Sequence, residues 1–216
     1  MNSIEEYRPR IKICGLFREE DIQAVNESLP DYCGFVIDFP KSHRNVSRRR
    51  AYELRQNLRV EVSPVGVFVD RPVNEVAELM QYGVIDVAQL HGSEDDEYID
   101  TLKAAAPDKE IWKSFIINAV DTKEDIEKVF RQAERSLADV VLLDAGYGYG
   151  AVFDHTLIGS FRRPYILAGG ITPDNVSDAL WSLKPYGVDV STGVETDNLK
   201  DKEKIADIIR LVREVQ

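Results

Sequence analysis

Short apolar runs alternate with longer amphipathic segments along most of the chain. Eight runs have the length and β-branched character of buried strands, and they span Ile11–Leu16, Cys33–Ile37, Val65–Val69, Val87–Leu90, Ile111–Ile117, Val140–Asp144, Tyr165–Ala168 and Val188–Ser191. Apolar residues recur at helical spacing in Glu19–Leu29, Ser47–Leu58, Val73–Tyr82, Asp95–Ala105, Lys123–Arg135, Asp174–Leu183 and Lys202–Val215. The sixth connection, Phe153–Phe161, carries a shorter helical pattern. This alternation of strands and helices predicts a parallel sheet.

The length of the chain favours closure of this sheet into one barrel. A chain of 216 residues fits a single-domain (β/α)8 barrel of the TIM type better than an open, doubly wound sheet. We expect residues 1–10 to form a polar, loose lead-in and residues 11–216 to form the barrel domain. Before the seventh helix, Thr172 is predicted as the N-cap residue and Pro173 as the first helical residue.

The alternation of side chains along each strand predicts which residues face the inside of the barrel. On the first strand, Ile11 and Ile13 point outward toward the helices, so Cys14 points inward near the carboxyl end. The same rule turns further polar side chains inward, namely Gln89, His91, Asp144, Asp189 and Ser191. They converge on the carboxyl-end mouth, where the active sites of barrels lie. Core packing does not explain them, because buried polar groups cost free energy unless they are paired.

Glycine-rich turns follow the last two strands. Gly169 and Gly170 close the seventh strand, and Ser191, Thr192 and Gly193 close the eighth. Glycine lets the backbone approach a ligand closely and lets backbone N–H groups point at it. Loops at these two places are the usual phosphate site of barrels, so we expect a phosphate site there.

The acidic composition limits the kinds of molecule that the protein is expected to bind. A net charge of -11 argues against nucleic acid and against an anionic membrane, because both require a basic face. An anionic substrate must then be held by local donors. Cys14 and Cys33 do not form a disulfide framework, and Cys33 is expected to be a buried apolar residue. With neither a signal-peptide pattern nor an apolar run of about 20 residues, we expect a cytoplasmic location.

Several short motifs occur in the order in which one enzyme family has them. They are Lys12–Leu16, Gly34–Val36, Pro40–Arg44, Val65–Val69, Ala88–Gly92, Leu142–Asp144, Phe153–Asp154, Ala168–Val176 and Val188–Glu195. On these motifs the chain resembles the phosphoribosylanthranilate isomerases of tryptophan biosynthesis. The resemblance implies a ribulose-phosphate-binding barrel that works without cofactor or metal. It leaves the oligomeric state open between a monomer and a homodimer.

The family's reaction is an Amadori rearrangement of N-(5-phosphoribosyl)anthranilate, a small anionic phosphosugar. An acid opens the sugar ring to an iminium, and a base removes the proton from C2. By resemblance, Cys14 is the general base, Asp144 is the general acid, and Arg44 binds the anthranilate carboxylate. The resemblance places the phosphate on the backbone around Gly169, Gly170, Ser191, Thr192 and Gly193.

Each of these roles makes a demand on its surroundings. Cys14 needs a nearby cation that lowers the pKa of its thiol, and Lys12 lies two residues back on the same face. Asp144 must be protonated when it acts, so we expect the apolar run before it to raise the pKa of its carboxyl group. Gln89, His91 and Asp189 are expected either to bind substrate or to satisfy hydrogen bonds inside the barrel.

The chain departs from the family pattern at three places. Phe17 stands where Thr is usual, the loop Tyr147–Gly150 and the following Phe153–His155 differ, and the usual Gly after Glu195 is missing. These changes leave a second hypothesis open, in which the chain is a paralogue of the family that binds a phosphosugar without turnover or with altered specificity. A pentulose-phosphate epimerase would need metal-type His and Asp ligands at several strand ends. An indole-glycerol-phosphate synthase would need a Lys and Glu set, for which Lys113 alone is a candidate.

Overall fold

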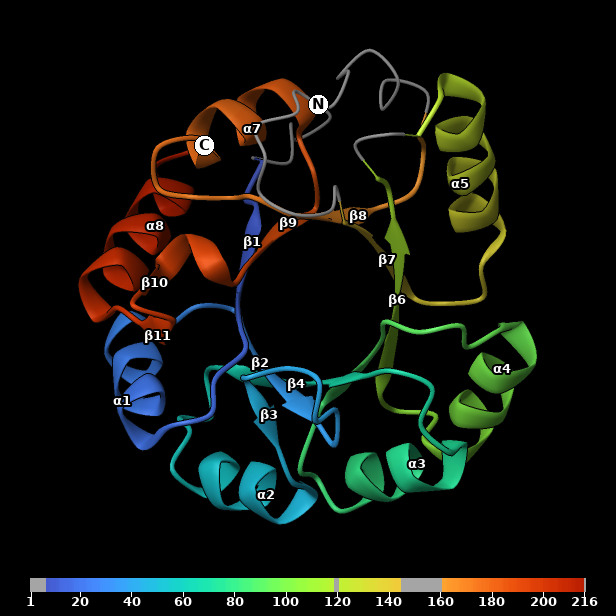
Figure 1. The fold of residues 1–216 in the computed structure, drawn as a ribbon, viewed down its shortest axis with the longest axis horizontal. Coiled ribbons are helices and arrows are strands. Elements are labelled where there is room, and N and C mark those ends of the chain that lie inside the picture. Colours follow the sequence, from blue (N-terminus) through green and yellow to red (C-terminus); the bar gives the residue numbers. More distant parts are fainter. Residues whose placement is uncertain (1–6, 119–120, 145–160, 216) are drawn as a thin grey trace, which may run out of the picture.

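The computed structural model describes residues 7–118, 121–144 and 161–215. Eight parallel strands form its central barrel (Figure 1), namely β1 (Arg10–Cys14), β2 (Tyr32–Ile37), β4 (Ser63–Phe68), β5 (Val87–Leu90), β6 (Glu110–Ile116), β7 (Val140–Asp144), β8 (Tyr165–Ala168) and β9 (Gly187–Val190). β1 pairs with both β2 and β9, so the sheet closes on itself. A short strand, β3 (Asn45–Val46), pairs with the end of β2. The predicted barrel is confirmed, and each strand end lies within two residues of its predicted position.

Helices surround the barrel on the outside (Figure 1). The described residues contain seven α-helices, which are α1 (Glu19–Ser28), α2 (Arg48–Gln56), α3 (Val73–Gln81), α4 (Asp96–Ala105), α5 (Lys123–Arg135), α7 (Val176–Leu183) and α8 (Lys202–Glu214). Four of them begin after a residue whose side chain accepts a backbone N–H bond of the first turn, namely Ser47, Asp95, Thr122 and Asp201. None of these helices combines the length and apolar character that a bilayer crossing requires. The predicted helix Phe153–Phe161 lies outside the described residues except for Phe161.

The predicted start of the helix after β8 is wrong by three residues. α7 begins at Val176 with Asn175 as its N-cap residue, whereas the sequence predicts Pro173 as the first helical residue. The Asn175 side chain donates to the carbonyl oxygen of Gly170 at 2.8 Å and accepts from the backbone N–H of Thr172 at 2.9 Å. Because these bonds hold the segment as a turn, the helix starts only after Asn175.

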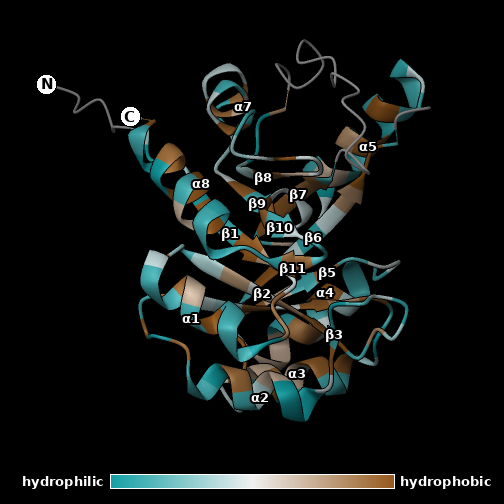
Figure 2. Ribbon diagram, turned by 60° about the vertical axis from the view of Figure 1, so that its left-hand side comes forward, coloured by the Kyte–Doolittle hydropathy of each residue, from teal (hydrophilic) through white to brown (hydrophobic). Residues whose placement is uncertain are grey.

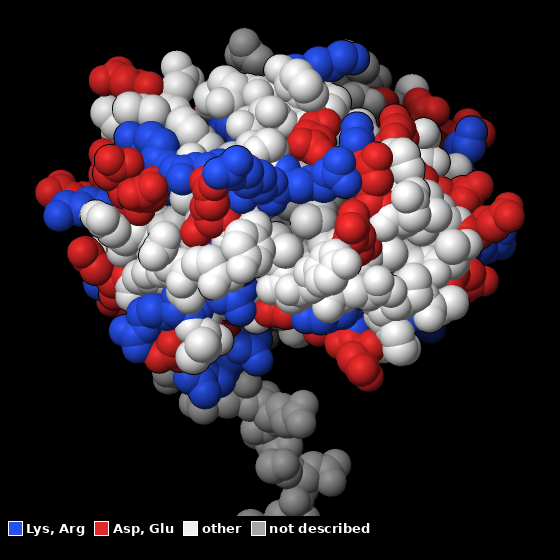
Figure 3. Space-filling model, turned by 90° about the horizontal axis from the view of Figure 1, so that it is seen from below, with Lys and Arg blue, Asp and Glu red and all other residues white. Residues whose placement is uncertain are grey.

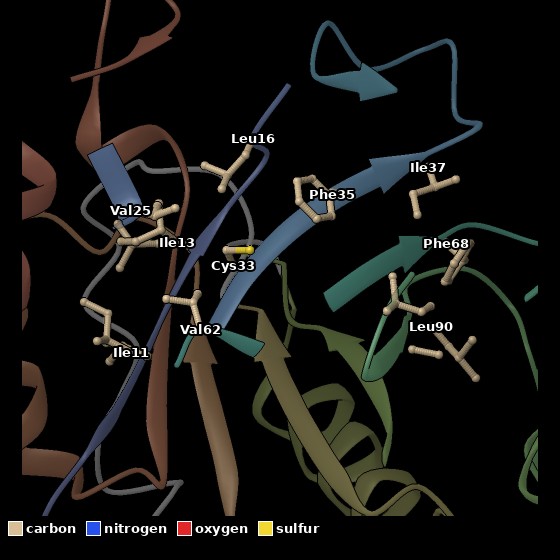
Figure 4. Close-up of a cluster of buried hydrophobic side chains, with 14 of the residues drawn as sticks. Ile11, Ile13, Leu16, Val25, Cys33, Phe35, Ile37, Val62, Phe68 and Leu90 are labelled. Atoms are coloured by element: carbon tan, nitrogen blue, oxygen red, sulfur yellow. The ribbon is translucent and has the colours of Figure 1, made fainter. Parts of the chain in front are cut away.

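Apolar side chains form a continuous layer between the barrel and the helices. Ile11 and Ile13 on β1 are fully buried in this layer, together with Cys33 and Phe35 on β2 (Figure 4). Figure 2 shows the same division, with apolar colour on the strands and on the helix sides that face them. The predicted outward direction of the Ile pair and the apolar role of Cys33 are confirmed.

A second apolar cluster fills the inside of the barrel, and it consists of Val65, Val87, Trp112, Leu142, Ile166 and Ala168. Trp112 is fully buried, and its ring packs edge-on against Tyr32 with the ring centroids 4.8 Å apart. Its indole N–H donates to a carboxylate oxygen of Glu110 at 2.9 Å. Ala168, the last residue of β8, borders the cavity described below, whereas the other five side chains of the cluster do not.

The outer face over α2 and α3 carries charges of both signs side by side (Figure 3). Arg48 pairs with Asp38 at 3.2 Å, and Arg49 pairs with Glu53 at 3.0 Å. Exposed ion pairs of this kind contribute little to stability. The arginine-rich start of α2 is therefore a solvated surface.

Trp112 offers a direct test of the packing inside the barrel. Trp112→Ala removes a fully buried ring, so we expect the free energy of unfolding to fall by about 3–5 kcal/mol. The matched control is Trp181→Ala, because Trp181 on α7 is 55% exposed. This control should change stability by less than about 0.5 kcal/mol. Urea unfolding followed by circular dichroism measures both, and equal losses would contradict the interior packing.

Candidate active site

A cavity of about 470 Å³ opens at the carboxyl ends of the strands. The predicted base and acid, Cys14 on β1 and Asp144 on β7, both line it. It is also lined by the predicted residues Arg44, Gln89, His91, Gly169, Gly170, Asp189, Ser191 and Thr192. Gly193 is the one predicted site residue that does not border this cavity. The fold therefore brings together side chains from strands far apart in the sequence.

An ion pair lies next to Cys14 inside the barrel. Lys12 Nζ is 2.9 Å from Asp189 Oδ2, and the Lys12 side chain is completely buried. Lys12 and Asp189 are register partners on the paired strands β1 and β9. Burial alone would lower the pKa of Lys12, but Asp189 and Cys14 together raise that pKa above its ordinary value. Lys12 is therefore a fixed positive charge beside the thiol.

Opposing effects set the pKa of the Cys14 thiol. Burial raises it most, the charge and hydrogen bond of Lys12 lower it, and the charge of Asp189 raises it again. The net result is a pKa above the ordinary value. The predicted influence of Lys12 is confirmed in its sign, but burial outweighs it. A thiol of this kind gives little thiolate at neutral pH, and the thiolate it gives is a strong base.

A chain of polar contacts leads from the barrel interior to Asp144. Gln89 Nε2 donates to Ser114 Oγ at 3.3 Å, and His91 Nδ1 lies 2.9 Å from the same oxygen. His91 Nε2 lies 3.9 Å from Asp144 Oδ2. Ser114 Oγ thus links the Gln89 amide to the His91 ring, and the other ring nitrogen of His91 faces Asp144. Gln89 and His91 thus have partners inside the barrel and also border the cavity.

Arg44 is held by an acidic residue for which the sequence predicts no role. Its Nε and Nη2 donate to the two carboxylate oxygens of Glu195, each at 2.7 Å, and Lys200 Nζ lies 2.6 Å from Glu195 Oε1. Burial alone would raise the pKa of Glu195, but hydrogen bonds from Arg44 and Lys200 lower it to about 2. The stem of Arg44 crosses Gly15, where an added Cβ would lie 2.3 Å from Arg44 Cδ. Any larger residue at position 15 would displace the arginine.

The two glycine-rich loops lie against each other at the rim of the barrel. Gly169 and Gly170 have positive φ angles of 90° and 65°, which favour glycine. Gly193 lies in the 3-10 helix η1 (Thr192–Val194), where an added Cβ would be 1.9 Å from the carbonyl oxygen of Ile171. Gly193 therefore allows the close approach of the loops, while its neighbours border the cavity.

Some site residues have no role predicted from the sequence. The loop after β2 contributes lining residues that the motif Pro40–Arg44 contains or adjoins, namely Phe39, Lys41, Ser42 and His43. Glu195 and Lys200 are missed because Glu195 lies 151 positions from Arg44 along the chain. The one local feature of the sequence that could indicate them is the Asp197-Asn198 dipeptide between them. Both residue types tolerate a tight hairpin turn, which would bring Glu195 and Lys200 together.

A second cavity, of about 630 Å³, lies beside α4 and α5. It contains the buried pair of Lys113 and Glu94, whose charged atoms are 2.9 Å apart. His91 borders both cavities, but Cys14 and Asp144 border only the smaller one, which is the candidate active site. In the part of the chain that the structure describes, no three His, Cys, Asp or Glu side chains are placed to share a metal ion.

Fold and cavity together define the class of protein. A closed parallel barrel that gathers a thiol, a carboxyl group and a guanidinium at its carboxyl-end mouth is a (β/α)8 barrel equipped for acid–base chemistry. The sequence profile of the N-(5'-phosphoribosyl)anthranilate (PRA) isomerase family matches residues 11–210, and the chain belongs to this family. The predicted resemblance is thereby confirmed over nearly the whole barrel.

Individual relatives agree with this assignment. The isomerase of Endomicrobium trichonymphae is 40% identical over 205 residues, which cover 95% of this chain and 98% of the relative. A phosphoribosylanthranilate isomerase solved with reduced 1-(o-carboxyphenylamino)-1-deoxyribulose 5-phosphate is 31% identical, with a TM-score of 0.78 over 94% of this chain and 98% of the other. A structure of monomers of the dimeric isomerase from Thermotoga maritima is 30% identical, with a TM-score of 0.77 over 95% and 99% of the two chains.

The departures from the family pattern fall partly outside the described residues. Tyr147–Gly150 and Phe153–His155 lie in the segment 145–160, of which the structure describes nothing. Phe17 is partly buried against the core layer, and the guanidinium carbon of Arg18 lies 5.7 Å from the centre of its ring. Phe17 thus has an apolar packing role after β1.

The opposing influences on Cys14 predict how its reactivity responds to pH. Only the thiolate reacts with iodoacetamide, so alkylation should accelerate with pH and reach half of its maximum rate above the ordinary pKa of a thiol. Lys12→Met removes a cation that stabilises the thiolate, so this midpoint should move to higher pH. Asp189→Asn removes an anion that opposes the thiolate, so the midpoint should move to lower pH.

A Cys33→Ala background leaves Cys14 as the only cysteine of the chain during this measurement. Circular dichroism should show that each variant remains folded. Midpoints that move in the same direction in both variants would contradict the charges assigned around the thiol.

Proposed function

We propose that this chain isomerises N-(5-phosphoribosyl)anthranilate to 1-(2-carboxyphenylamino)-1-deoxyribulose 5-phosphate, a step of tryptophan biosynthesis. The observation that carries the proposal is that Cys14, Asp144 and Arg44 line one cavity although they come from different parts of the barrel. Membership of the PRA isomerase family supports the same reaction. The reaction moves hydrogen within one molecule, so a base and an acid suffice.

Asp144 acts first, as the general acid. It protonates the ring oxygen of the furanose, the bond from C1 to that oxygen breaks, and the lone pair of the anilino nitrogen forms the iminium. His91 Nε2 lies 3.9 Å from Asp144 Oδ2, and both residues border the cavity. The proton that Asp144 gives up is retained on the new C4 hydroxyl group.

Cys14 acts second, as the general base. The iminium withdraws electrons from C2, so the thiolate can remove the C2 proton. The electron pair of that C–H bond becomes the C1–C2 double bond of an enolamine. The Cys14 thiol then gives its proton to C1, and the C2 hydroxyl gives its proton to the Asp144 carboxylate, which completes the ketone and restores both groups. Lys12 supports this step because its charge and hydrogen bond favour the thiolate.

Two buried acceptors suit the hydroxyl groups of a sugar. Asp189 Oδ1 and Gln89 Oε1 are buried and have no hydrogen-bond partner among the described protein groups. A buried acceptor without a donor costs about 1–3 kcal/mol. The hydroxyl groups of the open-chain ribose would supply these donors, so we assign Asp189 and Gln89 to sugar contact.

The substrate has an anionic group at each end, and the cavity offers a separate site for each. Arg44 faces the cavity with a planar guanidinium, which can bind the anthranilate carboxylate. The backbone around Gly169, Gly170 and Ser191–Gly193 would bind the phosphate. A relative has been solved with a reduced form of the product, which has the same two anionic ends.

We further propose that the chain works in the cytoplasm as a monomer or a homodimer. The Thermotoga maritima relative is described as dimeric, and monomers of it have been solved.

Turnover of freshly generated PRA tests the proposed reaction. The substrate is fluorescent, and its fluorescence should decay at a rate proportional to the concentration of the protein. A decay no faster than the uncatalysed background would reject the proposed function.

The acid and base assignments have their own test. Cys14→Ala and Asp144→Asn should each lower kcat by about 10²-fold or more, because each removes one proton-transfer group. The matched control is Cys33→Ala, since Cys33 is buried in the layer between barrel and helices and should leave kcat nearly unchanged. Near wild-type kcat in either active-site variant would refute the role of that residue.

A further inference from the structure

Three charged side chains at the rim of the cavity form one cluster, which consists of Arg44, Glu195 and Lys200. Glu195 lies between the two cations, 2.7 Å from Arg44 Nε and 2.6 Å from Lys200 Nζ. The side chains of Lys200 and Glu195 are 0% and 6% exposed, and that of Arg44 is 17% exposed. Interactions in a cluster this buried are screened weakly by water and salt.

A short hairpin holds the acid and the lysine side by side. β10 (Glu195–Thr196) pairs antiparallel with β11 (Leu199–Lys200), and Glu195 and Lys200 are direct cross-strand partners. Asp197 and Asn198 form the turn between them, with positive φ angles of 53° and 61°. A two-residue hairpin turn of this kind requires such angles. The backbone therefore fixes the spacing of Glu195 and Lys200 independently of Arg44.

Lys200 is held in the cluster by acceptors on two residues, Glu195 and Ser191. Its Nζ donates to Glu195 Oε1 at 2.6 Å and to the carbonyl oxygen of Ser191 at 2.9 Å. Burial lowers the pKa of Lys200, and the hydrogen bond and charge of Glu195 offset part of this effect. A buried amine without such partners would carry a large desolvation cost. The hydrogen bonds to Glu195 and Ser191 therefore hold the buried ammonium group of Lys200 in place.

The charges of the cluster leave one net positive charge for a ligand. Arg44 and Lys200 contribute two positive charges and Glu195 contributes one negative charge. Without Lys200, the pair of Arg44 and Glu195 would be neutral and would attract an anion only weakly. Glu195 engages Nε and Nη2 of Arg44, and a guanidinium has five N–H donors in all, so donors are left for a second carboxylate.

We propose that Glu195 and Lys200 are positioning residues that make Arg44 a receptor for a carboxylate on the ligand. Glu195 fixes the plane of the guanidinium, and Lys200 offsets the charge of Glu195 so that Arg44 keeps its attraction for an anion. This inference rests on the proposed function, in which the carboxylate is that of the anthranilate ring. A pair that only stabilised the loop would affect all ligands alike, whereas a positioning pair affects those with a carboxylate.

Two ligands that differ by one carboxyl group separate these possibilities. The first is reduced 1-(2-carboxyphenylamino)-1-deoxyribulose 5-phosphate, and the second is the same compound made from aniline, without the carboxyl group. Titration calorimetry gives Kd for both. Lys200→Met should weaken binding of the first ligand by about tenfold or more, because the cluster loses its net charge, and that of the second by less than about threefold.

A double variant tests the charge argument directly. In Lys200→Met with Glu195→Gln, the cluster again carries one net positive charge, so part of the lost affinity for the carboxylate-bearing ligand should return. If Lys200→Met folds poorly, Lys200→Gln serves as a second single variant. It also removes the positive charge, but its amide keeps a hydrogen-bond donor for Ser191. The double variant should bind the second ligand no better than Lys200→Met does.

Asp31 provides a matched control at the opposite end of the barrel. It pairs with Arg10 at 2.8 Å and with Arg213 at 2.9 Å, and its side chain is 11% exposed. Asp31→Asn thus also breaks a partly buried contact of one acid with two cations, and it should leave both Kd values unchanged.

Equal weakening of both ligands by Lys200→Met would overturn the inference, and so would the absence of any recovery in the double variant. A wild-type protein that binds both ligands equally would remove the carboxylate role of Arg44 and the inference with it. The proposed reaction is tested separately by turnover of PRA, so the two failures are distinguishable.

Discussion

A lysine and an aspartate face each other across the seam where the barrel closes. Lys12 on β1 and Asp189 on β9 are register partners, and their charged atoms lie 2.9 Å apart inside the barrel. Two charges withdrawn from water persist only as a pair, because removal of one partner costs about 3–5 kcal/mol. The same lysine is the cation nearest in sequence to Cys14 on its strand face and favours the thiolate. The pair therefore bridges the two strands that close the barrel, and both of its charges also act on the thiol.

The two faces of each strand have separate tasks. Outward residues such as Ile11 and Ile13 are buried against the helices and supply stability, while inward residues near the carboxyl ends border the cavity. The negative charge of the whole protein does not rule out an anionic ligand, because Arg44 presents a local positive charge to the cavity. Arg44 keeps its charge available although it is bound to Glu195, since Lys200 compensates that acid.

Strand parity explains why much of the fold and of the site follows from the sequence. The inward direction of Cys14, Gln89 and Asp189 depends only on local alternation within each strand, and the structure confirms it. Contacts between distant segments do not follow from such a rule. The partner of Arg44 lies on a hairpin far along the chain, and the turn before α7 depends on side-chain bonds of Asn175 that no periodicity reveals. The pKa of the Cys14 thiol depends most on how deeply the side chain is buried, and the sequence alone does not give that burial.

The contact between Gly193 and Ile171 couples the loop after β8 to the loop after β9 at the rim of the barrel. With no space for even a methyl group at that point, neither loop can move toward the other without displacing it. A designer who wishes this barrel to accept a different anion must therefore rebuild both loops in a single step. Transplanting one of them from a related scaffold would bring a foreign backbone against the carbonyl group of the other.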